Sequence, residues 1–159
     1  MTNPKDIKFL VLDVDGTLTD GGIYLLDNGA EAKKFNAKDG LGIKQLQRLK
    51  KVRVGMISGS VNNKIIGERA KMLRVEHWYA GNRDKLQVLN DWLGKMKLNS
   101  EQVAYIGDDL NDMSIMLSVG LKVCPADAVK SIKEKCDIVL KTNGGEGCVR
   151  EFIDEYLLD

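Results

Sequence analysis

The stretch FLVLDVDG, residues 9–16, limits most strongly what this chain can fold into. Its four leading apolar residues are typical of a strand that is buried on both faces. Asp13 and Asp15 follow with one residue between them, so two negative charges stand at the end of a buried strand. Mutual repulsion and desolvation both penalise such a pair. The sequence therefore predicts a cation, or a chemical step, at this strand end.

Short apolar runs alternate with segments of helical periodicity along the rest of the chain. We expect a small hairpin, made by residues 23–26 and 32–35, around the turn Asp27-Asn28-Gly29. The expected helices cover residues 41–49, 65–73, 86–96 and 129–135, with another after residue 112 and a final one at the end of the chain. The expected strands after the hairpin cover residues 52–57, 103–106, 121–124 and 138–140. This order predicts one α/β domain over residues 1–159, with a doubly wound, mainly parallel sheet.

Charge and cysteine content limit the classes of partner. The 24 basic and 23 acidic residues leave a net charge of +1, and neither sign forms a long block. Nucleic acid and anionic membranes normally require a clustered basic surface, so we expect neither as a partner. The three cysteines form no CxxC pair, which favours reduced thiols in a cytoplasmic protein. No stretch approaches the roughly 20 apolar residues of a membrane span.

Polar residues follow the expected strands at the edge where ligands bind in sheets of this kind. Asp13 and Asp15 follow the first strand, and Ser58 and Gly59 follow the second; Lys85 stands at the start of a helix. A later strand leads into a cluster made of Asp108, Asp109, Asn111 and Asp112. Carboxylates from different strands, without histidine or cysteine beside them, suit Mg²⁺.

Bound Mg²⁺ would offset the repulsion between the aspartates and let one of them attack a phosphoryl group. The other aspartate would protonate the leaving oxygen and later deprotonate the attacking water. Ser58, Lys85 and backbone N–H groups would hold the phosphoryl oxygens. The pattern favours a Mg²⁺-dependent phosphomonoesterase.

These segments resemble, in the same order, the motifs of the haloacid dehalogenase superfamily of aspartate-nucleophile phosphatases. Asp13-Val14-Asp15-Gly16-Thr17 resembles the first motif, Ser58 the second, Lys85 the third, and Gly107-Asp108-Asp109 with Asp112 the fourth. The resemblance implies that Asp13 is the nucleophile and Asp15 the general acid/base. It also implies that Mg²⁺ binds the carboxylates of Asp13 and Asp108 and the backbone carbonyl of Asp15.

Further stretches make nearly the whole chain similar to the 3-deoxy-D-manno-octulosonate 8-phosphate phosphatase family. They are Thr19-Asp20-Gly21-Gly22, Lys33-Lys34-Phe35-Asn36, Asp39-Gly40, residues 105–112, and Gly144-Gly145-Glu146-Gly147 with Arg150-Glu151. The resemblance implies a capless homotetramer that hydrolyses a sugar-acid phosphate in lipopolysaccharide sugar biosynthesis. The candidate substrate-contacting residues are Lys33, Ser60, Arg69 and Arg150.

Ser60 departs from this family. The residue after the glycine of the second motif is typically arginine there, and it can be glutamate in relatives that act on a nine-carbon nonulosonate 9-phosphate. Because the short neutral side chain of Ser60 matches neither, the nine-carbon substrate stays an alternative.

A signalling receiver domain is the alternative from another class, because receivers are also doubly wound and phosphorylated on aspartate with Mg²⁺. A receiver has an adjacent acidic pair after its first strand and its phosphorylated aspartate after its third. In this chain the spaced pair Asp13 and Asp15 comes first and the acidic cluster comes late, which disfavours a receiver.

The intervals from Asp13 to Ser58 and from Ser58 to Lys85 leave no room for a cap domain, which needs about 50 residues. We therefore expect the hairpin to cover the site by pairing with copies of itself in a symmetric oligomer.

Overall fold

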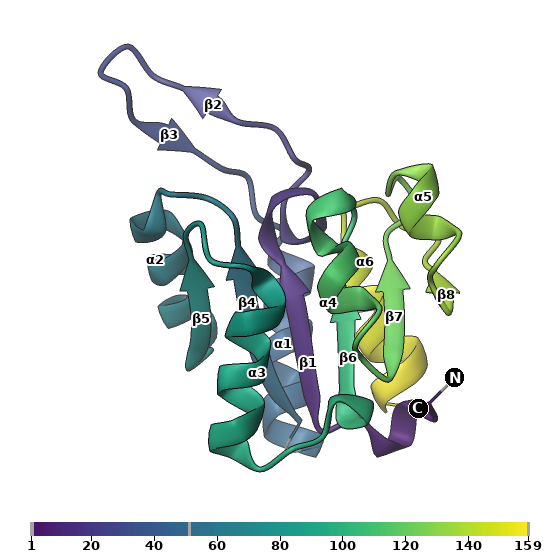
Figure 1. The fold of residues 1–159 in the computed structure, drawn as a ribbon. Helices are drawn as coiled ribbons and strands as arrows, with labels where there is room; N and C mark the ends of the chain where they lie inside the picture. Colours follow the sequence, from purple (N-terminus) through teal and green to yellow (C-terminus); the bar gives the residue numbers. More distant parts are fainter. Residues whose placement is uncertain (1, 51, 159) are drawn as a thin grey trace.

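A six-stranded sheet forms the centre of the molecule, and the computed structural model describes residues 2–50 and 52–158 (Figure 1). Its strands are β1 (Phe9–Asp13), β4 (Arg53–Ser58), β5 (His77–Ala80), β6 (Val103–Ile106), β7 (Leu121–Cys124) and β8 (Ile138–Val139). The spatial order is β5-β4-β1-β6-β7-β8, and every neighbouring pair is parallel. This is the doubly wound α/β fold that the sequence predicts.

The strand order also bears on the receiver alternative. Numbered within the sheet alone, the order is 3-2-1-4-5-6, with β1 between β4 and β6. This is the dinucleotide-fold order, whereas receivers have the flavodoxin-like order 2-1-3-4-5. The topology therefore excludes a receiver domain.

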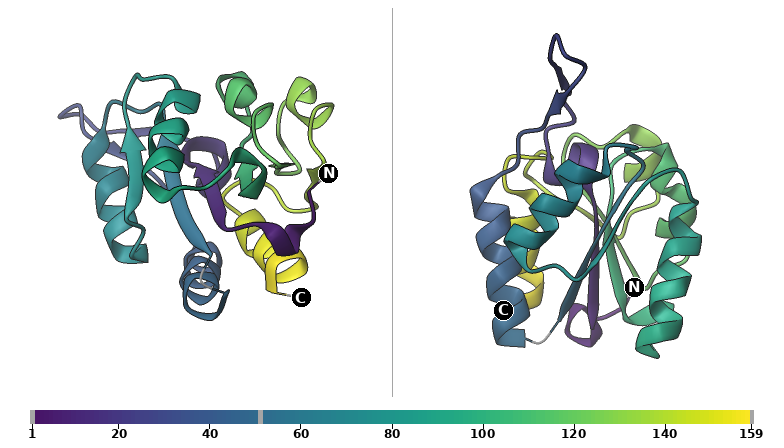
Figure 2. Two further views of the ribbon diagram at one scale, coloured as in Figure 1. Left: turned by 60° about the horizontal axis from the view of Figure 1, so that its bottom comes forward. Right: turned by 90° about the vertical axis from the view of Figure 1, so that its left-hand side faces the viewer.

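Helices cover both faces of the sheet (Figure 2). One face is covered by α1 (Ala37–Lys50), α2 (Asn63–Leu73) and α6 (Cys148–Phe152). The other is covered by α3 (Lys85–Met96), α4 (Met113–Met116) and α5 (Lys130–Lys133). Successive β1 side chains point to opposite faces, so Leu10 and Leu12 enter the first core while Phe9 and Val11 enter the second. Burial on both faces explains the continuous apolar run of this strand.

The predicted hairpin projects from the body of the protein above the carboxyl ends of the strands (Figure 1). Its two short strands, β2 (Tyr24–Leu25) and β3 (Glu31–Ala32), are antiparallel. Gly29 closes the turn with a φ of 78°, in the left-handed region that glycine adopts without strain. An isolated antiparallel bridge between Thr19 and Phe35 joins the base of the hairpin.

Two differences from the sequence prediction stand out. Strand β5 was not expected, because its aromatic residues lie at the sheet edge, half-buried or exposed, and form no run of buried aliphatic side chains. The hairpin strands are shorter than predicted, and the return strand Glu31–Ala32 overlaps only the first residue of the predicted segment 32–35. The remaining strands and helices lie where expected, with shifts at their ends. None of the helices in the described ranges is long and apolar enough to cross a bilayer.

Candidate active site

The carboxyl ends of three neighbouring strands bring the predicted site residues together. Asp13 is the last residue of β1 and Ser58 the last of β4, and Asp108 follows β6 after one glycine. Parallel pairing aligns these strands, with Asp13 opposite Ile57, so their ends lie at one edge of the sheet. Residues far apart in the sequence thereby become neighbours.

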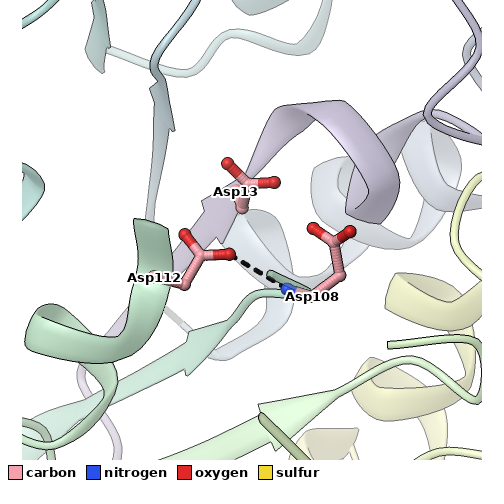
Figure 3. A group of neighbouring side chains, drawn as sticks. All are labelled: Asp13, Asp108 and Asp112. Atoms are coloured by element: carbon pink, nitrogen blue, oxygen red, sulfur yellow. Dashed lines mark hydrogen bonds between the residues drawn. The ribbon is translucent and has the colours of Figure 1, made fainter. Parts of the chain in front are cut away.

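Asp13, Asp108 and Asp112 form a compact acidic cluster (Figure 3). One carboxylate oxygen from each lies within 4.8 Å of the others. The side chains of Asp13 and Asp112 are buried, and Asp108 is half-buried. Three carboxylates this close require a compensating positive charge.

Lys85 supplies one positive charge to this cluster. Its Nζ lies 2.5 Å from Oδ1 of Asp13 and 2.6 Å from Oδ1 of Asp112, and its side chain is buried. Lys85 is the first residue of α3, whose N-terminus is capped by Asp84, a carboxylate acceptor for the backbone N–H of Leu86 at 2.9 Å. The cap and the start of the helix fix where this ammonium group lies.

Burial and mutual repulsion raise the pKa values of the acidic cluster. Burial raises the pKa of Asp13 well above its usual range, the charge of Asp112 adds to the effect, and Lys85 opposes it. Burial, with the charges of Asp112 and Asp109, raises the pKa of Asp108 to about 6. Burial by itself would lower the pKa of Lys85, but Asp13 and Asp112 outweigh it and raise this pKa. The single positive charge of Lys85 thus does not balance the negative charges of the three carboxylates.

The cluster fits a divalent cation. Oδ1 of Asp108 is buried and has no hydrogen-bond partner among the described residues, whereas a buried carboxylate oxygen normally has one. An oxygen-preferring ion such as Mg²⁺ would satisfy this atom and supply the missing charge. The donor set contains only oxygen atoms, as Mg²⁺ prefers.

Asp112 orients the cluster through four donors. It accepts hydrogen bonds from Lys85, from the Tyr105 hydroxyl at 2.6 Å, and from the backbone N–H groups of Asp108 at 3.0 Å and Asp109 at 3.3 Å. With its oxygens so engaged, Asp112 is better suited to support the loop than to ligate an ion. The sequence predicts Tyr105 as part of a buried strand. The signal for its role is that a buried tyrosine hydroxyl normally has a hydrogen-bond partner.

The Asp15 carboxylate contacts two residues outside the acidic cluster. Its Oδ1 lies 2.5 Å from Nζ of Lys33, and its Oδ2 accepts a hydrogen bond of 3.1 Å from the Ser58 hydroxyl. The Ser58 hydroxyl in turn accepts from the backbone N–H of Ser60 at 3.0 Å. The structure therefore brings Lys33 and Ser58 to Asp15, although Lys33 was predicted as a substrate contact.

Gly16 allows the chain to turn directly after Asp15. It has a φ of 93°, and an added Cβ would lie 2.1 Å from Oδ2 of Asp108. Gly144, in the glycine-rich loop, lies against the same turn, because its added Cβ would meet the Gly16 carbonyl oxygen at 1.7 Å. Both positions exclude any side chain.

A cavity of about 610 Å³ opens beside the cluster, and Gly59, Lys85 and Asn111 are among its lining residues. These predicted site residues therefore share one opening to solvent. Asp109 is exposed, and its carboxylate caps the following turn by accepting from Leu110 N–H at 2.7 Å. The Ser60 hydroxyl likewise accepts from Asn62 N–H at 3.2 Å.

The structure does not bring Arg69 and Arg150 to the acidic cluster. The Arg69 guanidinium lies 5.0 Å from the centre of the Phe35 ring, and its Nη2 donates to the Asn36 carbonyl at 3.0 Å. The Arg150 side chain pairs with Asp154 at 2.6 Å. Contact of either arginine with a substrate stays a prediction.

Comparison with known proteins identifies the family. Residues 60–153 match the haloacid dehalogenase-like hydrolase family. The chain is 42% identical over 158 residues to 3-deoxy-D-manno-octulosonate 8-phosphate phosphatase of Salmonella typhi, covering 99% of this chain and 83% of that protein.

Solved structures agree with this match. The crystal structure of the Yersinia pestis 3-deoxy-D-manno-octulosonate 8-phosphate phosphatase has a TM-score of 0.92 at 41% identity, covering 98% of this chain and 83% of that one. The Moraxella catarrhalis phosphatase of the same name, solved with magnesium, phosphate and KDO, has a TM-score of 0.92 at 32% identity, covering 98% of this chain and 88% of that one. The chain belongs to the haloacid dehalogenase-like hydrolase family and is a phosphatase of that family.

Proposed function

We propose that this phosphatase hydrolyses 3-deoxy-D-manno-octulosonate 8-phosphate, a sugar-acid phosphate, in the cytoplasm as a step of lipopolysaccharide sugar biosynthesis. The similarity to phosphatases named for this substrate extends over 99% of the chain, so it includes every element that carries a predicted site residue. The observation that carries the proposed chemistry is the buried Lys85 between Asp13 and Asp112, beside the unpartnered Asp108 oxygen.

Asp13 is the proposed nucleophile. One of its carboxylate oxygens attacks phosphorus, the bond from phosphorus to the sugar oxygen breaks, and an aspartyl phosphate forms on Asp13. Lys85 holds the Asp13 carboxylate in place and places a positive charge beside the phosphoryl oxygens. In this position the lysine reduces the repulsion between the carboxylate and the incoming phosphate.

Asp15 is the proposed general acid and base. It donates a proton to the departing sugar oxygen, which leaves as the alcohol. The resulting Asp15 carboxylate then takes a proton from water, and the water oxygen attacks the phosphorus of the aspartyl phosphate. This second step releases orthophosphate and restores both aspartates to their starting forms.

Mg²⁺ is the proposed cofactor. The carboxylates of Asp13 and Asp108 and the backbone carbonyl of Asp15 would hold it. When bound, the ion neutralises phosphoryl charge and lowers the repulsion within the acidic cluster.

A nine-carbon nonulosonate 9-phosphate is the second candidate substrate, and Ser60 is the reason. The Ser60 side chain is short and neutral. Its hydroxyl accepts a hydrogen bond from the backbone N–H of Asn62 at the turn before α2. It offers neither a positive nor a negative charge with which to select one sugar acid over the other.

We further propose that the protein assembles as a homotetramer through its hairpin. Four consecutive apolar residues of the hairpin, Ile23 to Leu26, are each more than half exposed in the single chain. Exposed apolar surface of this kind is typical of an interface. Sedimentation at micromolar concentration should give about four times the chain mass; a monomer that is stable on dilution and fully active would contradict the tetramer.

Phosphate release from a panel of sugar phosphates tests the substrate. We expect the eight-carbon sugar-acid phosphate to give the highest kcat/KM, followed by the nine-carbon compound. A clear preference for a nucleotide or for phosphoserine would contradict the substrate while leaving the chemistry in place.

Substitution of the two aspartates tests the mechanism. Asp13→Asn should abolish turnover, and Asp15→Asn should lower kcat by about 10²- to 10⁴-fold, as expected for lost acid/base catalysis. Near-normal turnover by Asp13→Asn would rule out the nucleophile assignment.

A further inference from the structure

The side chain of Lys33, on the return side of the hairpin, is buried although that of the adjacent Lys34 is exposed. The Lys33 side chain is 2% exposed and pairs with Asp15, whereas the Lys34 side chain is 60% exposed and pairs with Asp20 at 2.8 Å. A buried ammonium group is costly unless it is paired. The structure therefore places the Lys33 charge specifically against Asp15.

Asp15 is held from two sides by different parts of the chain. Lys33, which directly follows β3, contacts Oδ1, and Ser58, at the end of β4, donates to Oδ2. Contacts at both oxygens fix the rotation of the carboxylate about its side-chain bonds. Neither partner belongs to the acidic cluster of Asp13, Asp108 and Asp112.

A general acid must be held within hydrogen-bond reach of the oxygen that it protonates, and small displacements are costly in rate. The β-hairpin is a projecting element that is joined to the body at its base by the bridge between Thr19 and Phe35. Lys33 lies two residues before Phe35, so the position of its ammonium group follows the position of the hairpin base.

We propose that Lys33 is a positioning residue, which holds the general acid/base Asp15 in its working orientation and thereby links the hairpin to the proton-transfer step. The proposal rests on the proposed phosphatase mechanism. It differs from the sequence prediction for Lys33, because the ammonium group acts on an enzyme carboxylate instead of contacting the substrate.

The dependence of kcat/KM on the leaving group tests this role. This ratio reports the steps up to departure of the leaving group, in which Asp15 donates its proton. Phenyl phosphate, with a basic leaving oxygen, requires that proton, whereas 2,4-dinitrophenyl phosphate does not. Lys33→Met should lower kcat/KM by about 10²-fold or more for phenyl phosphate and by less than about 3-fold for the dinitrophenyl ester.

Lys34→Met is the matched control, because it removes the same charge one residue away. It should change kcat/KM by less than about 3-fold for both esters, since an exposed ion pair contributes little. Lys33→Arg, which keeps a buried cation, should recover part of the loss on phenyl phosphate. It also serves as the second variant if Lys33→Met fails to fold, since a changed head group should still lower the phenyl phosphate rate selectively.

Each outcome decides the proposal. If Lys33→Met lowered kcat/KM equally for both esters, Lys33 would contact the phosphate or only stabilise the fold. If kcat/KM were unchanged for both, Asp15 would need no such partner. Either result overturns the proposal. If the wild-type protein hydrolysed no phosphate ester, the proposed function itself would fail. That result is distinct from a failure of the Lys33 variants alone.

Discussion

The hydroxyl group of Tyr105 donates a hydrogen bond of 2.6 Å to Oδ1 of Asp112, and neither residue is accessible to solvent. The same oxygen lies 2.6 Å from Nζ of Lys85, which also contacts Asp13. Tyr105, in the interior of the sheet, thereby supports the proposed nucleophile Asp13 indirectly, through Asp112 and Lys85. Burial raises the pKa of Tyr105 far above its usual range, as does the charge of Asp112, so the hydroxyl keeps its proton and remains a donor.

Tyr105→Phe should therefore affect stability and activity together. The variant leaves a buried carboxylate without one of its donors, and we expect the free energy of unfolding to fall by about 1–3 kcal/mol. Because Asp112 orients Lys85, kcat should fall as well. Tyr156→Phe is the control, since that ring stacks on Phe152 and not on the acidic cluster. Urea unfolding and steady-state kinetics measure the two effects; equal behaviour of the two variants would contradict the role of Tyr105.

Gly16→Ala should disable the cation site. The new Cβ would lie 2.1 Å from Oδ2 of Asp108 at a φ of 93°, so collision adds to backbone strain. Gly29→Ala separates the two causes, because its φ of 78° imposes strain while nothing lies within 4 Å of the added Cβ. We expect Gly29→Ala to cost about 1–2 kcal/mol of stability without changing Mg²⁺ affinity. Gly16→Ala should lose Mg²⁺ affinity in a calorimetric titration; equal affinities in the two variants would refute the collision.

Removal of a single carboxylate should identify the residue that binds the cation. Asp108→Ala should weaken Mg²⁺ binding at least tenfold, because Asp108 offers a buried oxygen with no partner among the described residues. Asp109→Ala is the matched control and should weaken it much less, because the Asp109 carboxylate is exposed and caps the next turn.

Removal of the metal ion with a chelator should abolish turnover by the wild-type enzyme, and added Mg²⁺ should restore it. Ca²⁺ should restore turnover poorly, because its coordination shell is larger and less rigid. Full turnover by metal-free protein would contradict the cofactor.

Asp39 should make the protein less stable as the pH rises from about 4 to 6. Burial raises its pKa from the ordinary 3.8 to about 6, so within this window the folded chain holds a proton that the unfolded chain has released. This contribution to the free energy of unfolding is fully present below about pH 4 and lost above about pH 6, and its upper limit is about 3 kcal/mol.

Asp39→Asn should remove this dependence, because the amide carries no charge and its oxygen can still accept the Arg150 N–H, now bound at 2.8 Å. Unfolding free energies of both proteins at several pH values test the claim. The difference between the two curves isolates Asp39 from the acidic cluster, and parallel curves between pH 4 and 6 would contradict it.

Local sequence patterns determined the fold and most of the site. The apolar run before Asp13 requires burial on both faces, and alternating strands and helices then require a parallel sheet. Parallel strands end at one edge, so Asp13, Ser58 and Asp108 had to meet there whatever the details of packing. Lys85 was predicted at the start of a helix, and the structure places it at this edge through the short loop from β5, an unpredicted strand, to α3.

Only the tertiary structure decided which side chains contact one another. The sequence predicted Lys33 as a substrate contact, whereas its side chain is buried against Asp15, 18 residues away. The sequence predicts Tyr105 as a core residue. Its hydroxyl reaches its partner Asp112 only because the loop after β6 folds back toward the sheet. Arg69 was predicted as a substrate contact, and only the structure shows that its guanidinium lies over the Phe35 ring. The periodicity of apolar residues along the sequence specifies which face of a helix or strand each residue occupies. Ion pairs instead depend on the distance between side chains of different elements, which is set only when those elements pack against one another.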